Sequence, residues 1–571
     1  MIKLFLFFGI LMLTACATLE RKTEYNQADL ILINGNIITL EENLPTAEAI
    51  AIRGGIIEEV GTNDQIRALA GPDSKTIDLN GATVIPGFIE GHGHFLGLGE
   101  MQRVVDLTAT RNFEEVVRLV AAAAKDAAPG EWIIGRGWHQ EKWDQLPENN
   151  VQGYPHHQQL SVASPDHPVI LDHASGHAIM SNNKAMEMAG ISPATNDPAG
   201  GKIIRDASGA PIGVFEENAA VLIGQYYDKH LASLTAEEQY DNWKKSILAA
   251  TEEAHKKGIT SFHDAGVPFH QIEYYQRLKS EDQLQMRMYI MINDELQRLQ
   301  QENWKPLIDA EDHLLTVRAI KKYMDGALGS RGAWLLTPYT DDPGNTGQNV
   351  TPIQELTTTA EIAAANGLQL AVHAIGDRAN REVLDLYQKI FKASGNNNRR
   401  WRIEHAQHID PADIPRFAEL DVIASMQAIH CISDAPYVEK RLGEERAEAG
   451  AYVWGRLLEA GVTIANGTDA PVEDVDPLLN YYASVTRKSL MTDEPFYPEQ
   501  ALTRMEALRS LTINNAFAAF EDELKGTLRK GKLADIVVLE KDITTISPDE
   551  LLNAKVLYTL LNGKIVYENK P

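Results

Sequence analysis

The chain has 571 residues, of which 44% are hydrophobic, and it carries a formal net charge of −27. This length exceeds what one small core needs and suits a large barrel with an accessory domain. The acidic balance argues against nucleic-acid binding, because that binding needs clustered Lys and Arg to neutralise phosphates. It is typical instead of a globular protein kept in solution by self-repulsion.

The N-terminus, residues 1–16, has the pattern of a secretory signal. Lys3 precedes an apolar run, residues 4–12, that is shorter than the ~20 residues needed to cross a bilayer. Leu13-Thr14-Ala15-Cys16 follows and resembles the bacterial lipobox, which implies cleavage before Cys16 and lipid on its thiol. We therefore expect a periplasm-facing lipoprotein of the bacterial cell envelope, anchored at the outer membrane, with residues 17–27 as a polar tether. The alternative is an ordinary signal peptide with an incidental cysteine.

Short β-like runs occur at both ends of the mature chain. These apolar runs, broken by Asn-Gly and Gly-Gly turn signals, are residues 28–39, 49–60, 534–539 and 556–567. Because the two ends share this texture, we expect residues 28–83 and 521–571 to form one small β-sandwich domain around the central part.

Between the ends, apolar strand candidates alternate with helical patterns, which is typical of parallel βαβ construction. The candidates are residues 84–90, 259–263, 286–291, 317–322, 369–373, 402–405, 422–427 and 462–468. Eight strands close a (β/α)8 TIM barrel, so the predicted fold class is α/β, with the barrel over residues 84–520. Residues 95–258 are far more than one connection requires, and we expect an insertion that forms a lid or a substrate wall.

Several strand candidates end in residues of the kinds that bind metals. His92 and His94 follow the first candidate, and residues two apart on a strand share a face, so both rings can reach one ion. His373, His405 and Asp469 end three later candidates. Active-site residues of such barrels lie at the carboxyl ends of the strands, so the sequence predicts that these side chains meet there.

The segments around these residues are similar to a known family. The motifs are Ile320-Lys321-Lys322-Tyr323-Met324-Asp325-Gly326, His373-Ala374-Ile375-Gly376-Asp377, Arg402-Ile403-Glu404-His405 and Gly467-Thr468-Asp469-Ala470-Pro471. Together they resemble the amidohydrolase superfamily, and within it the amidohydrolase 3 branch that contains N-substituted formamide deformylases. The resemblance covers nearly the whole mature chain. Its motifs are specific for the family and not for the substrate.

The resemblance implies a binuclear metal centre. In the family pattern His92 and His94 bind one ion, while His373 and His405 bind the other. Lys321 matches a lysine that bridges the two ions once it is carboxylated; if it stays a plain amine, the site is mononuclear or organised otherwise. We expect two divalent metals per chain, with Zn first and with Mn, Fe, Co or Ni as alternatives for imidazole and carboxylate donors.

Such a metal lowers the pKa of bound water to about 7 and polarises the carbonyl under attack, which suits amide hydrolysis. Asp469 would accept the proton of that water and pass it to the departing nitrogen. The expected function is metal-dependent hydrolysis of a non-peptide C–N bond, of amide or N-formyl type, in a small molecule. A deaminase or a hydrolase of lactones, esters or phosphotriesters stays open, as does a non-catalytic metal-binding envelope or regulatory protein. We expect membrane contact only through the lipid anchor, and self-association stays open.

Other side chains are candidates for supporting roles. Those that would line the substrate pocket, each with a structural role weighed equally, are Trp138, His177, Arg331 and His430. His263 and Asp264 end the second strand candidate and would support metal-bound histidines. Glu404 precedes a predicted ligand, should face away from it, and is interpreted as structural.

Overall fold

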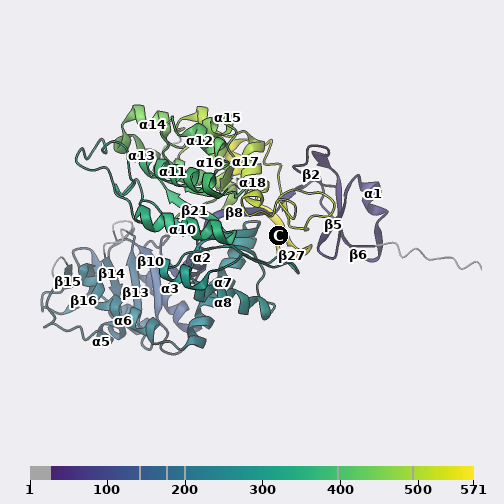
Figure 1. Cartoon of the computed structure of the whole chain (residues 1–571). Helices are drawn as coiled ribbons and strands as arrows, with labels where there is room; N and C mark the ends of the chain where they lie inside the picture. Colours follow the sequence, from purple (N-terminus) through teal and green to yellow (C-terminus); the bar gives the residue numbers. More distant parts are fainter. Residues whose placement is uncertain are drawn as a thin grey trace, which may run out of the picture.

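The computed structural model describes residues 27–140, 143–174, 178–198, 201–394, 398–490 and 494–570. The predicted signal, the lipidation site Cys16 and the tether up to residue 26 lie outside these ranges, as does His177. Figure 1 shows a central barrel, with the large insertion to one side and the sheets near the chain ends to the other.

In the described part of the chain, eight strands form a parallel sheet whose neighbours follow the sequence order. These are β8 (Phe88–Gly93), β17 (Ile259–Val267), β18 (Arg287–Ile292), β20 (Leu315–Tyr323), β21 (Gln369–Ala374), β22 (Arg402–His405), β23 (Ile423–Met426) and β24 (Ile464–Asn466). A short strand, β19 (Leu307–Ile308), adds to β20 in the antiparallel sense. Each of the eight overlaps a predicted strand, so the predicted α/β barrel is confirmed as a nearly closed parallel barrel.

The first and last strands of the barrel meet at a seam. The backbone N–H of Asp469 donates to the carbonyl of His92 over 2.7 Å, and the Asn515 amide donates to one carbonyl of each strand over 2.6 and 2.7 Å. Gly467 is required here, because a Cβ at this position would lie only 2.4 Å from the backbone nitrogen of His92. The seam therefore brings the loop after β24 directly beside the end of β8.

The predicted first strand, residues 84–90, is divided between two sheets. β7 (Thr83–Pro86) joins a sheet at the chain ends, and β8 begins at Phe88. Gly87 lies between them against Thr260, whose Oγ1 would be 2.2 Å from a Cβ at position 87. The apolar pattern did not reveal this division, because both halves are buried.

Strands from both chain ends pair in one sheet, of order β27-β26-β25-β7-β2-β3, and a second sheet has the order β5-β4-β1-β6. The elements are β1 (Ala28–Ile33), β2 (Asn36–Ile38), β3 (Thr46–Ala47), β4 (Ala49–Arg53), β5 (Ile56–Gly61), α1 (Asn63–Arg67), β6 (Ala70–Asp78), β25 (Ile536–Leu539), β26 (Val556–Leu561) and β27 (Lys564–Glu568). Both sheets contribute to one hydrophobic cluster, with Leu32 from β1 and Val538 from β25. The β-sandwich itself stays a prediction.

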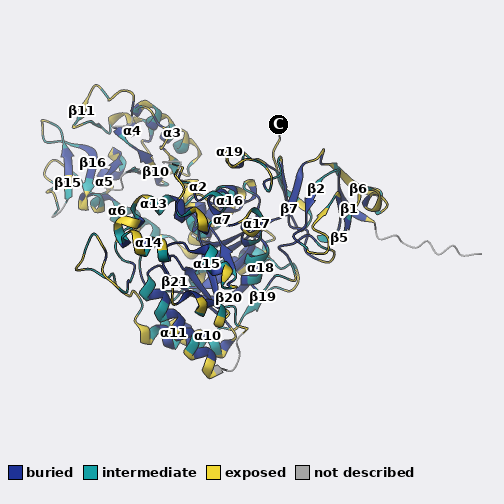
Figure 2. Cartoon of the chain, turned by 90° about the horizontal axis from the view of Figure 1, so that it is seen from above, coloured by how far each residue is buried: buried dark blue, intermediate teal, exposed yellow. Residues whose placement is uncertain are grey.

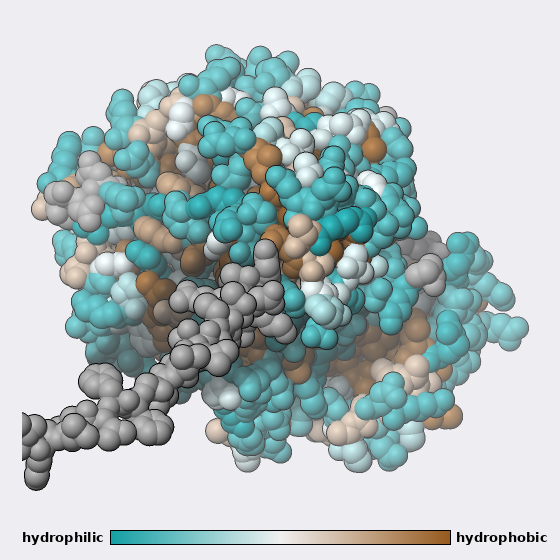
Figure 3. All heavy atoms as spheres, turned by 90° about the vertical axis from the view of Figure 1, so that its right-hand side faces the viewer, coloured by the Kyte–Doolittle hydropathy of each residue, from teal (hydrophilic) through white to brown (hydrophobic). Residues whose placement is uncertain are grey.

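A buried ion pair joins this region to the barrel. Arg287 of β18 donates to Asp535, with Nε and Oδ2 2.5 Å apart, and the two side chains are 2% and 4% exposed. On the side of the molecule where the sheets of the chain ends lie, hydrophilic residues predominate on the surface and hydrophobic residues lie between them (Figure 3).

The insertion folds around its own sheet, of order β15-β16-β14-β13-β10-β9. Its elements are β9 (Val105–Asp106), α3 (Phe113–Asp126), β10 (Ile133–Trp138), β11 (Asn150–Val151), β12 (Tyr154–Pro155), α4 (Gln158–Ala163), β13 (Val169–His173), β14 (Ala178–Ser181), α5 (Asn183–Met188), β15 (Gly201–Arg205), β16 (Pro211–Glu217), η2 (Asn218–Ala220) and α6 (Val221–Ser233). The flanking helices α2 (Phe95–Arg103) and α7 (Ala236–Lys256) pack against each other, and Trp243 and Ile247 of α7 belong to the barrel core. The separate body is therefore shorter than residues 95–258.

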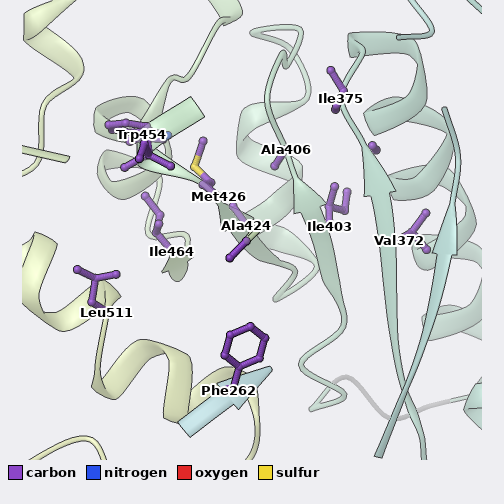
Figure 4. Close-up of a cluster of buried hydrophobic side chains, with 14 of the residues drawn as sticks. Phe262, Val372, Ile375, Ile403, Ala406, Ala424, Met426, Trp454, Ile464 and Leu511 are labelled. Atoms are coloured by element: carbon purple, nitrogen blue, oxygen red, sulfur yellow. The ribbon is translucent and has the colours of Figure 1, made fainter. Parts of the chain in front are cut away.

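Helices cover the outside of the barrel, and their apolar faces enclose its core. These helices, with the short ones near the C-terminus, are α8 (Phe269–Ser280), α9 (Leu296–Glu302), α10 (Ile353–Asn366), α11 (Asp377–Ser394), α12 (Ile414–Glu419), α13 (Ala428–Leu442), α14 (Glu444–Gly450), α15 (Trp454–Glu459), α16 (Pro477–Thr486), η3 (Pro498–Gln500), α17 (Arg504–Ser510), α18 (Ile513–Ala518) and α19 (Pro548–Leu551). Val372, Ile403 and Ala424 come from neighbouring strands of this core (Figure 4). Figure 2 shows the barrel strands buried, with exposed residues on the helices and loops outside them. No helix within the described ranges is both long and apolar enough to cross a membrane.

Candidate metal centre

The predicted ligands come together at the carboxyl ends of the barrel strands. His92 lies in β8, His373 in β21 and His405 at the end of β22. The ring centroids of His373 and His405 are 4.3 Å apart, and those of His92 and His405 are 5.0 Å apart. His94 is the N-cap residue of α2, with its ring centroid 5.9 Å from that of His92. The fold therefore assembles the imidazoles that the sequence pointed to.

Asp469 lies among these rings, just after β24. Its Oδ1 is 3.1 Å from Nε2 of His94 and 3.6 Å from Nε2 of His92. His92, His405 and Asp469 each offer a ligand atom within 4.8 Å of those of the other two, and all three residues are buried. The contact of Oδ1 with His94 does not have the geometry of a hydrogen bond, so among the described residues this buried oxygen has no hydrogen-bond partner, which is expected of an atom that serves as a ligand to a cation. This donor set fits a divalent metal.

Two of the candidate ligands have left-handed backbone conformations. The φ angle is 73° at His405 and 59° at Asp469. Residues other than glycine rarely adopt such angles, and strain of this kind gathers at functional sites.

The conformation at His405 also explains the position of the preceding residue, Glu404. Strand alternation would place Glu404 and His405 on opposite faces, but the turn of the backbone at His405 lets both side chains reach the centre.

The prediction that Glu404 is a structural residue whose side chain faces away from the metal centre is therefore wrong. Its Oε2 forms a short hydrogen bond with Nδ1 of His92, and its side chain is fully buried. Burial opposes the charged form, but Arg402 and His92 together hold the pKa of Glu404 well below its usual value. The carboxylate thus supports a predicted ligand directly, as partners of metal-bound histidines commonly do.

Three of the candidate imidazoles, those of His92, His373 and His405, are held in the neutral form that binds metals. Burial lowers the pKa of His92 to about 4 and that of His373 to about 3, and it also lowers the pKa of His405 well below the usual value. Nδ1 of His405 is 2.6 Å from Oε1 of Gln427, which leaves its Nε2 for a ligand. Neutral imidazoles are required because a proton and a metal compete for the same lone pair.

Lys321 projects from β20 into the same group. Its side chain is fully buried, and its Nζ lies 3.2 Å from Nε2 of His92. Burial lowers the pKa of this amine to about 8. Its neighbour Lys322 bonds instead to the backbone carbonyl of Asp294 over 2.7 Å, as the alternation of the strand predicts.

Two further buried carboxyl groups, those of Glu90 and Asp325, hold loops of the centre in place. Both oxygens of Glu90 accept hydrogen bonds from Thr468, at 2.7 and 3.0 Å, and Oε1 also accepts the N–H of His92 at 3.0 Å. Asp325, whose role the motif left open, accepts the backbone N–H groups of Ile375 and Gly376, at 2.9 and 2.8 Å. A charged residue inside an apolar run was the only sequence signal for Glu90.

Asp264 has a similar supporting role at the start of α2. It accepts the N–H of Phe95 at 3.2 Å and the hydroxyl of Tyr275 at 2.9 Å, so it fixes the chain directly after His94. His263, its neighbour, accepts from Arg402 through Nδ1 at 3.2 Å, and Arg402 in turn bonds to Glu404. Asp264 therefore supports the segment that carries His94, and His263 is linked through Arg402 to Glu404, the partner of His92.

The predicted substrate residues fall in different places. His430, in the first turn of α13, stacks near His405 with ring centroids 6.1 Å apart, and its Nε2 is buried without a partner among the described residues. Arg331 is paired with Asp341 over 2.9 Å. Trp138 is 1% exposed in the core of the insertion, where its Nε1 donates to the carbonyl of Leu171. Only His430 of the three described candidates therefore stands next to a predicted ligand.

A cavity of about 810 Å³ lies outside this centre. It is bounded by α2, α6, the start of α7 and the segment before β10, with Trp132 and Tyr227 among its walls, and none of the predicted ligands lines it.

Comparison with known proteins places the chain in a family. The family model described as "Amidohydrolase family" matches residues 75–567. "Protein LONG AFTER FAR-RED 3" of Arabidopsis thaliana is 33% identical over 95% of this chain and 92% of its own. "Putative amidohydrolase YtcJ" of Bacillus subtilis (strain 168) is 32% identical over 94% and 98%. "N-substituted formamide deformylase" of Arthrobacter pascens is 28% identical over 95% and 98%.

Among solved structures, an uncharacterized metal-dependent hydrolase from Pyrococcus furiosus superposes with a TM-score of 0.71 and 27% identity, over 90% of this chain and all of its own. Together with the buried His and Asp group, these similarities support a metal-dependent hydrolase that holds a divalent metal. The predicted resemblance is thereby confirmed, and the chain belongs to the amidohydrolase family.

Proposed function

We propose that the protein hydrolyses a non-peptide C–N bond, of amide or N-formyl type, in a small molecule. The observation that carries the proposal is the meeting of neutral, buried imidazoles with Asp469, whose Oδ1 is left without a hydrogen-bond partner among the described residues. The similarity to an N-substituted formamide deformylase along 95% of the chain favours this bond over others that a metal-dependent hydrolase attacks.

We propose two metal ions per chain, with zinc first and Mn, Fe, Co or Ni as alternatives. His92 and His94 would hold one ion, and His373 and His405 would hold the other. Lys321 would bridge them after carboxylation, which needs the neutral amine. Because burial lowers the pKa of Lys321 to about 8, a larger share of its amine is neutral at pH 7 than for an exposed lysine. Carboxylation would also replace a cation that repels metals with an anion that binds them.

The residues of the chain have separate tasks in the proposed reaction. When bound, a divalent metal supplies hydroxide at neutral pH and polarises the carbonyl. Asp469 accepts the proton released by the water and donates it to the departing nitrogen, so that an amine leaves and an acid remains. His430, whose Nε2 has no partner among the described residues, would donate a hydrogen bond to the substrate oxygen.

A panel of substrates tests the proposal. Purified protein without residues 1–16 is assayed for amine release from N-formyl and N-acyl amines, before and after treatment with a chelator and after restoring zinc. We expect release that stops on chelation and returns with zinc. Lactones, esters, phosphotriesters and aminopurines form the second half of the panel. Turnover of one of those alone would replace the proposed bond, and bound metal with no turnover of any compound would favour a non-catalytic metal-binding protein.

A further inference from the structure

A fully buried ion pair lies inside the barrel, next to the metal centre. Arg402 and Glu404 are two residues apart on β22 and therefore share a face of the strand. Nε of Arg402 is 2.5 Å from Oε1 of Glu404, and Nη2 is 2.9 Å from Oε2, so the pair is bidentate. Neither side chain is exposed at all. A buried pair of this kind is weak evidence for stability, because desolvation of two charges offsets their attraction.

The carboxylate of this pair has a second partner on another strand. Oε2 of Glu404 bonds to Nδ1 of His92, which lies 312 residues away in the sequence. Since a carboxylate only accepts, His92 must carry its proton on Nδ1, and Nε2 then presents a lone pair. That lone pair faces the side where Lys321 and Asp469 lie, at 3.2 and 3.6 Å. The contact thus selects the tautomer that can bind a metal.

Arg402 is held from several directions at once. Its Nη2 donates to the carbonyl of Gly91 over 2.8 Å and to the hydroxyl of Ser425 over 3.0 Å, and its Nη1 reaches Nδ1 of His263 at 3.2 Å. These contacts join β22 to three other strands of the barrel. One of them is the backbone directly before His92, so the same guanidinium holds both the main chain and, through Glu404, the ring of that residue.

We propose that Arg402 and Glu404 are positioning residues for the metal centre, in which Arg402 orients Glu404 and Glu404 holds His92 in its metal-binding tautomer and orientation. The inference rests on the metal centre proposed above. It assigns to the pair a task in metal affinity and not only in folding, in keeping with the large effects that partners of metal-bound histidines have elsewhere.

The test measures zinc affinity by competition with a chromogenic chelator, which requires no turnover. Glu404→Gln keeps the size of the side chain but lets its amide donate to Nδ1, and so stabilises the wrong tautomer. We expect it to weaken zinc binding by about 10- to 100-fold. Arg402→Lys keeps the charge but loses the bidentate geometry, and we expect a smaller loss in the same direction.

The pair Arg287–Asp535 provides the matched control, because it is also a buried Arg–carboxylate pair but links the barrel to the terminal sheets. Asp535→Asn should lower resistance to urea while zinc affinity stays within about twofold of the wild type. Circular dichroism of every variant shows whether it folds. If Arg402 acts through Glu404, the double variant R402K/E404Q should bind zinc no more weakly than E404Q alone.

Wild-type zinc affinity in folded E404Q would overturn the inference and leave the proposed function standing. Additive losses in the double variant would overturn the order in which the two residues act. A wild-type protein that takes up no metal would instead remove the proposed function together with this inference.

Discussion

Replacing Gly467 by alanine tests whether closure of the barrel positions the metal centre. A Cβ at this position would lie 2.3 Å from Oε1 of Glu90 and 2.4 Å from the backbone nitrogen of His92. Glu90 is itself tied to both sides of the seam by its hydrogen bonds to Thr468 and His92. The new methyl group therefore meets groups that cannot rotate away, and the first and last strands must separate.

The size of the effect follows from these contacts. Ordinary van der Waals contact begins at 3.4 Å, so the distance between the new Cβ and the backbone nitrogen of His92 must lengthen by about 1 Å. Overpacking of this kind costs about 1–3 kcal/mol of unfolding free energy. A misplacement of about 1 Å at a catalytic centre can reduce the rate by about 100-fold. We expect the loss of turnover to exceed what the loss of stability alone explains, because the strand that moves carries His92.

Urea titration measures the unfolding free energy, and the rate of amine release per bound metal measures the turnover of the metal centre. Gly224→Ala is the matched control, since Gly224 lies within α6 and a Cβ added there would meet nothing within 4 Å. That change should stabilise the helix by up to about 1 kcal/mol and leave turnover unchanged. If G467A matched the wild type in both measurements, the tight seam would not be what positions the centre.

Three further changes have defined outcomes. His405→Ala should lower the metal content found by elemental analysis while circular dichroism stays unchanged, and full metal content would remove His405 from the ligand set. Burial raises the pKa of Glu90 to about 8 from 4.5, so its contribution to stability is full below about pH 4.5 and is lost as the pH rises toward 8. Glu90→Gln should therefore flatten the decline of unfolding free energy over that range in urea titrations of the metal-free protein, and equal slopes in the two proteins would contradict this reasoning. Cys16→Ser should abolish lipid attachment, seen as loss of the acyl mass and release from the membrane fraction, whereas membrane association unchanged by the substitution would refute the predicted anchor.

The barrel and its candidate ligands could be predicted because their signals are local. Each strand overlaps an apolar run of the right length, and at the carboxyl ends of several strands a residue type that binds metals marks the site, as with His373 and His405. The division of the first strand at Gly87 had no such signal, because the two buried halves look alike in sequence and only the contact with Thr260 separates them.

Two of the supporting residues, Glu90 and Glu404, could not be predicted for a different reason. Glu404 bonds to His92 across 312 positions, and Glu90 accepts the backbone N–H of Thr468 across 378 positions. No spacing rule connects such partners. The alternation rule even placed Glu404 on the wrong side, because it assumes regular strand geometry up to the last residue, and the φ angle of 73° at His405 breaks that geometry.

Asp469→Asn tests whether Asp469 accepts the proton of the attacking water, because the change removes the proton acceptor and keeps a neutral oxygen in nearly the same place. Metal content and release of amine from an N-formyl substrate are measured on the same preparations of wild type and variant. We expect that D469N keeps most of its metal and that its turnover falls by about 100-fold or more, as removal of a general base does. Wild-type turnover in D469N would contradict the proton transfer assigned to Asp469, and with it the proposed reaction at this centre.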